Sequence, residues 1–161
     1  MITLLTPTYN RCAFLPALYE SLKRQTSKNF EWLIVDDGSE DGTKELVETF
    51  CAEENGFKIS YVFQQNGGKH TALNTGVNYC ESELTAIVDS DDFLLDDAVQ
   101  TIEENWVKYS MDGSLCGLVF LRQDRDGKVI GQKFPEDAYK SNYIDCRVNM
   151  GITGDKFEVF R

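Results

Sequence analysis

Three carboxylates fall within four residues of this chain, in the run Val88-Asp89-Ser90-Asp91-Asp92. The apolar segment 84–88 leads into them and predicts a short buried strand with the acids past its carboxyl end. Open α/β sheets bind their ligands at that end of their strands. Packed like charges need a positive partner, and a hard divalent cation shared with a substrate diphosphate is a common one. A solvated acidic turn is the alternative for this stretch taken alone.

Polar motifs follow three further apolar runs in the same way. Residues 6–11 (Thr-Pro-Thr-Tyr-Asn-Arg) follow the first, residues 36–43 (Asp-Asp-Gly-Ser-Glu-Asp-Gly-Thr) the second, and residues 66–70 (Asn-Gly-Gly-Lys-His) the third. Each motif alone is compatible with an ordinary turn, and His70, the sole histidine, is compatible with a packing or capping role. Together they predict one sheet edge lined with polar groups, where a nucleotide binds in such folds.

The elements that must position these motifs alternate between strand and helix. A first strand is expected at 2–6, ended by Pro7, and a last strand-like segment at 157–161. The other strands are expected at 30–35, 59–63, 84–88 and 115–121, and the helices at 13–25, 43–54, 71–79 and 98–107. This order predicts a mainly parallel sheet with helices on its faces. After residue 131 the periodicity is lost.

Composition restricts the class of protein. The chain has 161 residues and 42% hydrophobic content, which fits one globular domain. Its net charge of −11 argues against a nucleic-acid backbone as the partner, because such proteins present a basic face. The five cysteines form no CxxC pair and predict free thiols in a reducing cytoplasm. No apolar run approaches the roughly 18 residues of a membrane span.

The order and spacing of four stretches, 6–11, 35–43, 68–76 and 88–92, resemble family 2 glycosyltransferases, which are inverting enzymes with a GT-A fold. The match covers residues 1–95 and persists more weakly at 154–159. The resemblance implies a three-layer α/β/α domain around a mainly parallel sheet. Residues 1–95 would form the nucleotide-sugar donor half, and 96–161 the start of an acceptor half. We also expect this domain to continue past residue 161 in the full-length protein.

The resemblance assigns the donor nucleotide to four side chains. Thr6 and Tyr9 would contact it, and a tyrosine ring offers a flat apolar surface with a polar tip. Asp37 would accept the imide N–H of uracil, which suits a carboxylate because it only accepts hydrogen bonds. Asp36 is implied as a ribose contact.

Four charged side chains are assigned to the diphosphate and its metal. Lys69 would offset diphosphate charge, and Asp89 would contact the ribose as the first acid of a DxD motif. Asp91 would bind Mg²⁺ or Mn²⁺, with Asp92 as the alternative ligand. Such a cation stabilises the leaving nucleoside diphosphate.

An inverting transferase also needs a general base that deprotonates the acceptor hydroxyl. Asp155 and Glu158 are the acids of the late matching motif, and Asp155 is the candidate. Relatives with the same Gly-Asp-Lys run lead us to expect the base downstream of Arg161.

The sequence therefore predicts a metal-dependent enzyme that moves a sugar from a UDP-sugar to a saccharide or lipid-linked acceptor. Cell-surface, exopolysaccharide or capsular synthesis is the expected setting, in the cytoplasm or at the inner face of the membrane, with peripheral membrane association of the full-length protein.

Two other classes remain open. A nucleotidyltransferase would need a glycine-rich basic loop after the first strand, which residues 6–10 lack. A non-enzymatic receiver domain would carry its acidic pair after the first strand rather than the second.

Overall fold

The computed structural model describes residues 1–161 as six strands, four α-helices and one π-helix turn at Asp145–Asn149. The strands are β1 (Ile2–Thr8), β2 (Phe30–Asp36), β3 (Lys58–Phe63), β4 (Leu84–Ile87), β5 (Gly117–Leu121) and β6 (Lys156–Phe160). The helices are α1 (Leu15–Lys23), α2 (Thr43–Ala52), α3 (Lys69–Val77) and α4 (Ala98–Tyr109). The alternation expected from the sequence is thus confirmed.

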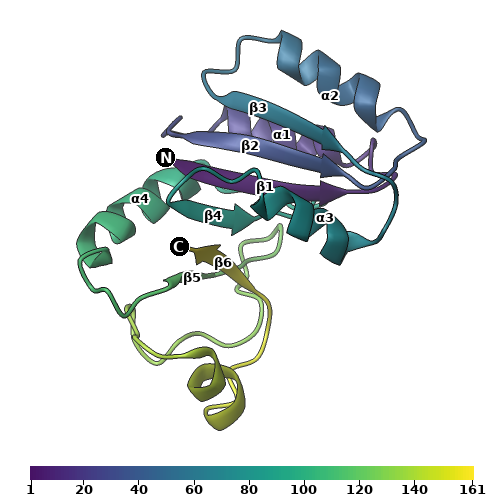
Figure 1. Cartoon of the computed structure of the whole chain (residues 1–161). Coiled ribbons are helices and arrows are strands. Elements are labelled where there is room, and N and C mark those ends of the chain that lie inside the picture. Colours follow the sequence, from purple (N-terminus) through teal and green to yellow (C-terminus); the bar gives the residue numbers. More distant parts are fainter. The chain divides into compact units, whose positions relative to one another are not determined.

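The strands form one mixed sheet in the order β3-β2-β1-β4-β6-β5 (Figure 1). The four strands β1 to β4 run parallel to one another, which places their carboxyl ends at one edge. β6 is antiparallel to β4, with Val159 opposite Ala86 and Phe160 opposite Thr85. The expected mainly parallel sheet is confirmed.

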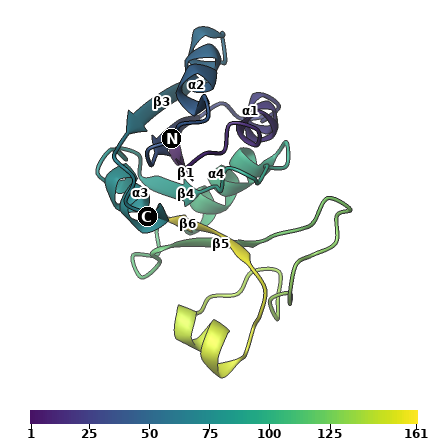
Figure 2. The same ribbon diagram turned by 90° about the vertical axis from the view of Figure 1, so that its right-hand side faces the viewer.

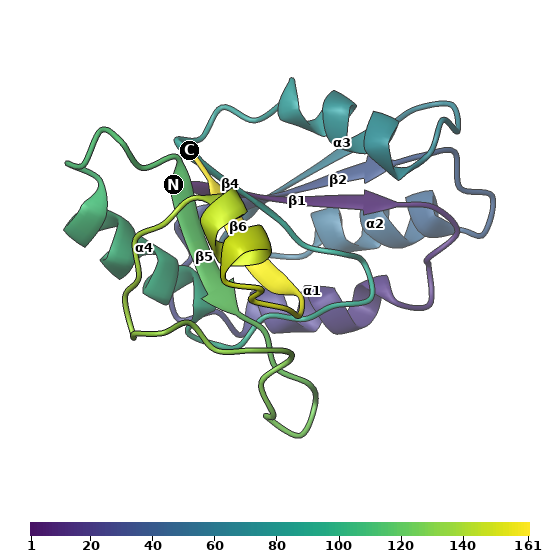
Figure 3. The ribbon, with the colours of Figure 1, turned by 90° about the horizontal axis from the view of Figure 1, so that it is seen from below.

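Helices cover both faces of the parallel part of the sheet. Figures 2 and 3 show α3 on one face, and α1 and α2 on the other, with α4 next to α1. The α3 face packs Leu5, Leu33, Val35 and Ala72 into one buried cluster. On the other face, Trp32 is fully buried and its ring stacks near Phe50. The three-layer α/β/α architecture is therefore confirmed.

β1 does not end at Pro7, as expected, but continues to Thr8. Leu5 O accepts a hydrogen bond from Val88 N on the β4 side, and Thr8 O accepts one from Asp37 N on the β2 side. Successive residues alternate between neighbours, so Pro7 faces the β4 side, where pairing has stopped at Leu5 and Ile87. A proline is tolerated there because no partner requires its missing N–H.

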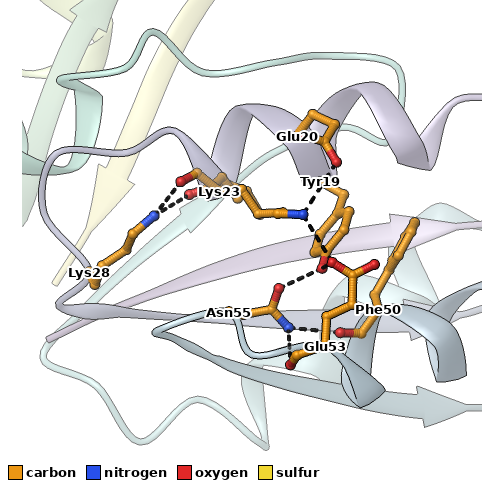
Figure 4. A network of polar contacts seen from close by, with 8 residues as sticks. Tyr19, Glu20, Lys23, Lys28, Phe50, Glu53 and Asn55 are labelled. Carbon is orange, nitrogen blue, oxygen red and sulfur yellow. Dashed lines mark hydrogen bonds and ion pairs between the residues drawn. The ribbon is translucent and has the colours of Figure 1, made fainter.

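A polar network ties α1 to the end of α2 (Figure 4). The hydroxyl of buried Tyr19 donates to Glu53 Oε2 at 2.9 Å, and Lys23 Nζ donates to the same oxygen at 2.9 Å. The Tyr19 ring also stacks on Phe50, with 4.0 Å between centroids. Burial and the Glu53 carboxylate raise the pKa of Tyr19 to about 12, so the phenol stays protonated and remains a donor. This network holds α1 against the end of α2, on the face of the sheet opposite α3.

The chain packs as two compact units, residues 1–118 with 159–161, and residues 119–158. The boundary expected near residue 95 lies inside the first unit. In the second unit, Gly131 and Gly154 approach so closely that a Cβ on either would collide with the other's backbone. Both have positive φ angles, 74° and 86°, which only glycine adopts without strain. No helix of either unit has the length and apolar character needed to cross a membrane.

Candidate functional site

A cavity of about 440 Å³ opens at the carboxyl ends of β1, β2 and β4, all within the first unit. Its walls come from the end of β1 and the loop after it, from Asp37 after β2, from the start of α3, and from the acidic loop after β4. The four motifs that the sequence analysis singled out therefore meet in one place. Their charged members in the wall are Arg11, Asp37, Lys69, Asp89 and Asp91.

The end of β1 contributes a buried hydroxyl without a partner. Thr8 lines the cavity and is 3% exposed, and its Oγ1 makes no hydrogen bond within the protein. A buried hydroxyl left unpaired is costly, so this atom calls for a ligand or a water. Tyr9, the next residue, also lines the cavity and is half exposed. Its ring is therefore available to a flat ligand.

Thr6, the other threonine of this motif, does not line the cavity. It is fully buried, and its Oγ1 accepts a hydrogen bond from Trp32 Nε1 at 2.9 Å. The structure thus places Thr6 in the core and Thr8 in the cavity wall. We expected β1 to end at residue 6 and therefore did not predict Thr8 as a site residue. The signal for it was a second threonine two positions after Thr6, on the same face of the strand.

The two acids after β2 occupy different positions. Asp36 is fully buried and lies outside the cavity wall, where it accepts hydrogen bonds from Tyr61 OH at 2.6 Å and Ser39 N at 2.8 Å. Both oxygens of Asp36 are thus engaged in holding β3 and the turn after β2. Asp36 could contact the ribose only if these two hydrogen bonds rearranged.

Asp37 does line the cavity, and it fastens the loop between β3 and α3. Its carboxylate accepts hydrogen bonds from Gln64 Nε2 at 2.6 Å, Gly67 N at 2.9 Å and Gly68 N at 2.7 Å. Burial raises the pKa of the Asp37 carboxyl, but these hydrogen bonds outweigh it, so the pKa lies below 3.8. A carboxylate offers about four acceptor positions, which leaves one for a ligand.

Two ion pairs cross the cavity. Lys69 Nζ donates to Asp89 Oδ1 at 2.6 Å, and Arg11 Nη1 lies 3.6 Å from Asp91 Oδ2. Lys69 is the first residue of α3. The helix begins after Gly68, which has a φ of 93°, and not at residue 71 as expected. Arg11 belongs to the motif at residues 6–11, but the sequence does not predict its pairing with Asp91. The available signal for a role of Arg11 in the site was its position two residues after Tyr9 in the same motif.

Asp92 lies outside the cavity wall, and its backbone N–H donates to Asp89 O at 3.0 Å in a tight turn. No group of three or more His, Cys, Asp or Glu side chains gathers closely enough to hold a metal by itself. Mg²⁺ is usually held by one or two carboxylates together with substrate phosphates and waters. Asp89 and Asp91 fit that donor set, so the residues present fit a cation bound jointly with a diphosphate.

Asp155, the candidate base, belongs to the second unit. Its Oδ2 is paired with Arg122 Nη1, and its side chain is 65% exposed. Arg122 belongs to the same unit, which also contains the buried Lys156.

Comparison with known proteins gives matches over the whole chain. Residues 3–160 match the sequence profile of Glycosyl transferase family 2. Glycosyltransferase GlyA of Streptococcus pneumoniae serotype 4 is 32% identical over 142 residues, which cover 86% of this chain and 20% of GlyA. Glycosyltransferase GlyG of the same organism is 30% identical over 139 residues, covering 83% of this chain and 45% of GlyG. The chain thus spans less than half the length of either relative.

Solved structures share the fold. S. aureus TarS superimposes with a TM-score of 0.72 at 25% identity, covering 99% of this chain and 46% of that one. The mannosyltransferase PcManGT from Pyrobaculum calidifontis, solved with GDP-Man and Mn²⁺, gives a TM-score of 0.69 at 21% identity, covering 99% and 44%. The expected resemblance is confirmed, and the chain belongs to glycosyl transferase family 2.

Proposed function

We propose that this chain forms the donor site of a glycosyltransferase that uses a UDP-sugar. The observation that carries the proposal is the cavity at the strand ends. It brings together an unpaired threonine hydroxyl, a half-exposed tyrosine ring, a buried carboxylate and two ion pairs. These groups match the parts of a nucleoside diphosphate one by one.

The base and the ribose would bind at the β1 and β2 side of the cavity. The Tyr9 ring supplies a surface for the uracil or the ribose, and the free acceptor position of Asp37 suits the imide N–H. The hydroxyl of Thr8 can donate to or accept from the nucleoside, which would satisfy its unpaired oxygen. In this proposal Thr6 supports the site through its hydrogen bond with Trp32 in the core. Asp36 supports it by holding the turn at Ser39.

The diphosphate would bind at the α3 and β4 side. Three carboxylates and two cationic side chains line the cavity, so its wall is not basic enough by itself to hold a diphosphate. Mn²⁺ or Mg²⁺ at Asp91, assisted by Asp89, would supply the missing positive charge and stabilise the leaving nucleoside diphosphate. Lys69, at the amino terminus of α3, would add its own charge to the same group. Asp92 remains the alternative ligand.

The proposed chemistry at the acceptor rests on membership of the family. An inverting transfer to a saccharide or lipid-linked acceptor needs one general base, for which Asp155 is the candidate within this chain. TarS has been solved with UDP and with UDP-GlcNAc, and PcManGT with GDP-Man and Mn²⁺. These neighbours support a metal and nucleotide-sugar site without deciding between uracil and guanine. We place the enzyme in the cytoplasm or at the inner face of the membrane, in cell-surface polysaccharide synthesis.

A calorimetric titration tests the donor assignment. UDP, GDP and dTDP are each titrated into the protein with Mn²⁺ and again with EDTA. UDP is expected to bind, and to bind more tightly with Mn²⁺ than with EDTA, because the free acceptor position of Asp37 suits the imide N–H of uracil and the cation joins the diphosphate to the acidic loop. Binding of GDP in preference to UDP would reassign the base, and binding of none of the three with Mn²⁺ would contradict the donor site itself.

Thr8→Val tests whether the unpaired hydroxyl meets the ligand. Valine has almost the same shape but no polar atom, so it removes a buried group that lacks a partner. We expect the midpoint of urea unfolding to stay the same or rise, while UDP affinity falls by roughly three- to tenfold, the value of one hydrogen bond of about 0.5–1.5 kcal/mol.

The matched control is Thr6→Val, which removes a hydroxyl that is hydrogen-bonded to Trp32. It is expected to lower stability and to change UDP affinity less than Thr8→Val. Equal UDP affinities of the wild type and Thr8→Val would show that a water, rather than the nucleotide, pairs with this hydroxyl.

A further inference from the structure

Each acid in the loop that follows β4 and faces the cavity is already paired with a cation from the protein. Lys69 Nζ holds Asp89 at 2.6 Å, and Arg11 Nη1 lies 3.6 Å from Asp91. These are the oxygens that a divalent cation would need. The protein itself therefore supplies positive partners to both carboxylates, and those partners compete with a metal.

The backbone of Arg11 is held independently of Asp91. Asn10 has a left-handed conformation with φ of 50°, its N–H donates to Ser39 Oγ at 2.8 Å, and its Oδ1 accepts from Glu40 N at 2.9 Å. On the other side, Cys12 N donates to Asp41 Oδ2 at 2.9 Å. The loop between β1 and α1 is thus fastened on both sides of Arg11, to the turn that follows β2.

The side chain of Arg11 is held much more weakly than its backbone. Its guanidinium lies 5.0 Å from the centre of the Phe14 ring and 3.6 Å from Asp91, and 44% of the side chain is exposed. A half-exposed ion pair contributes little to stability. The guanidinium can therefore leave Asp91 at small cost, while its anchored backbone keeps it at the mouth of the cavity.

We propose that Arg11 is a counter-ion that changes partners: it covers Asp91 in the free protein and moves to the diphosphate when nucleotide and cation bind together. This inference rests on the proposed donor site. A guanidinium and a divalent cation repel each other at one carboxylate, whereas a diphosphate offers the guanidinium two oxygens in the fork geometry that suits it. Lys69 acts on Asp89 in the same way.

The exchange makes cation and nucleotide depend on each other. A cation alone must displace Arg11 from Asp91 and leave it without an anionic partner. A nucleotide alone finds both cationic side chains occupied by carboxylates. When both ligands bind, every charge finds an opposite charge. Because coupling between two ligands is reciprocal, UDP must strengthen Mn²⁺ binding by the same factor by which Mn²⁺ strengthens UDP binding.

The test is a titration of the protein with Mn²⁺ alone, followed by the electron paramagnetic resonance signal of the free ion. Arg11→Gln removes the competing charge and keeps a polar side chain of similar length. We expect its affinity for Mn²⁺ alone to rise about three- to tenfold, and its affinity for UDP at saturating Mn²⁺ to fall at least about tenfold, as for the loss of a charged hydrogen bond. The coupling factor shrinks accordingly.

Two further variants sharpen the test. Arg11→Lys keeps the charge but loses the fork, so it should bind Mn²⁺ alone as the wild type does and bind UDP with intermediate affinity. Arg24→Gln is the matched control, because Arg24 pairs with Asp96 at 3.1 Å on the exposed surface outside the cavity wall. It should change neither titration. Circular dichroism checks that all variants are folded.

The outcomes separate this inference from the proposed function. If Arg11→Gln binds Mn²⁺ alone no more tightly than the wild type, the exchange is overturned, whatever UDP does. If Arg11→Gln raises Mn²⁺ affinity but leaves UDP affinity unchanged, Arg11 competes with the cation but does not move to the diphosphate, and the proposed change of partners is overturned. Failure of the wild type to bind any of the three nucleotides in the presence of Mn²⁺ would instead overturn the donor site.

Discussion

Replacing Asp91 with alanine is expected to remove the metal dependence of UDP binding. In the wild type, Mn²⁺ should strengthen UDP binding by roughly 5- to 150-fold, the usual range for coupling between two ligands. Asp91 lines the cavity and carries the carboxylate that would join the cation to the diphosphate. In Asp91→Ala the ratio of UDP affinities with Mn²⁺ and with EDTA should approach one, which paired calorimetric titrations measure directly.

Asp91→Ala also frees Arg11, since their ion pair is lost. UDP in EDTA should therefore bind the variant at least as tightly as it binds the wild type. The control is Asp96→Ala, which removes an exposed acid from the Asp96–Arg24 pair outside the cavity wall and should preserve the metal dependence. If Mn²⁺ still strengthened UDP binding to Asp91→Ala, the ligand would have to be reassigned to Asp92 or Asp89.

Replacing Asp37 with asparagine should have the largest combined effect on binding and stability. An amide in place of the carboxylate brings N–H groups toward the N–H groups of Gln64, Gly67 and Gly68, so at least one buried donor loses its acceptor. Each such loss costs roughly 1–3 kcal/mol. We expect the free energy of unfolding to fall by that amount, and UDP affinity to fall about ten- to a hundredfold.

The matched control for Asp37→Asn is Glu31→Gln, near the start of β2, the strand that precedes Asp37. Glu31 is 6% exposed and accepts hydrogen bonds from Thr3 Oγ1 and Lys58 Nζ. Its replacement should lower stability without changing UDP affinity. If Asp37→Asn lowered stability but left UDP binding intact, Asp37 would only fasten the loop between β3 and α3, and another group would have to read the base.

The pH dependence of stability provides a second readout for Asp37. Its pKa in the folded protein lies below the ordinary value of 3.8. A carboxyl with a lowered pKa stabilises the fold above its unfolded pKa, and this contribution is lost as pH falls through the folded value. Below about pH 4, the wild type should therefore lose stability more steeply than Asp37→Asn, which has no carboxyl to protonate at this position.

The parallel half of the fold could be predicted because its local signals agree with its tertiary structure. Apolar runs such as 30–35 are buried on both faces, and the polar motifs follow them directly. The end of β1 could not be predicted, because the tolerance of Pro7 depends on where β4 stops pairing. This is a property of two strands far apart in sequence, and it decides whether Thr6 or Thr8 faces the cavity.

Part of the cavity wall could be predicted from the sequence, but the hydrogen-bond and ion-pair partners of its residues could not. Asp37, Lys69, Asp89 and Asp91 were expected at one edge and lie there. That Asp37 would fasten a loop, or that Arg11 would cover Asp91, depends on loop geometry that no periodicity encodes. Residues 119–158 were beyond prediction for a similar reason, since their packing includes the close approach of Gly131 to Gly154 rather than a repeated apolar pattern.

The antiparallel strand β6 has a consequence for biosynthesis. It sits between β4 and β5 in the sheet but follows the five other strands of this sheet in the sequence. Until Val159 and Phe160 reach Ala86 and Thr85, one side of β4 presents unpaired N–H and C=O groups. An open strand edge is a template for pairing with another chain. On a polysome, neighbouring nascent chains expose the same edge at the same stage. Between the synthesis of β4 and the synthesis of β6, this edge is therefore open to pairing between chains. A chaperone that binds at that stage would protect the edge until β6 has left the ribosome.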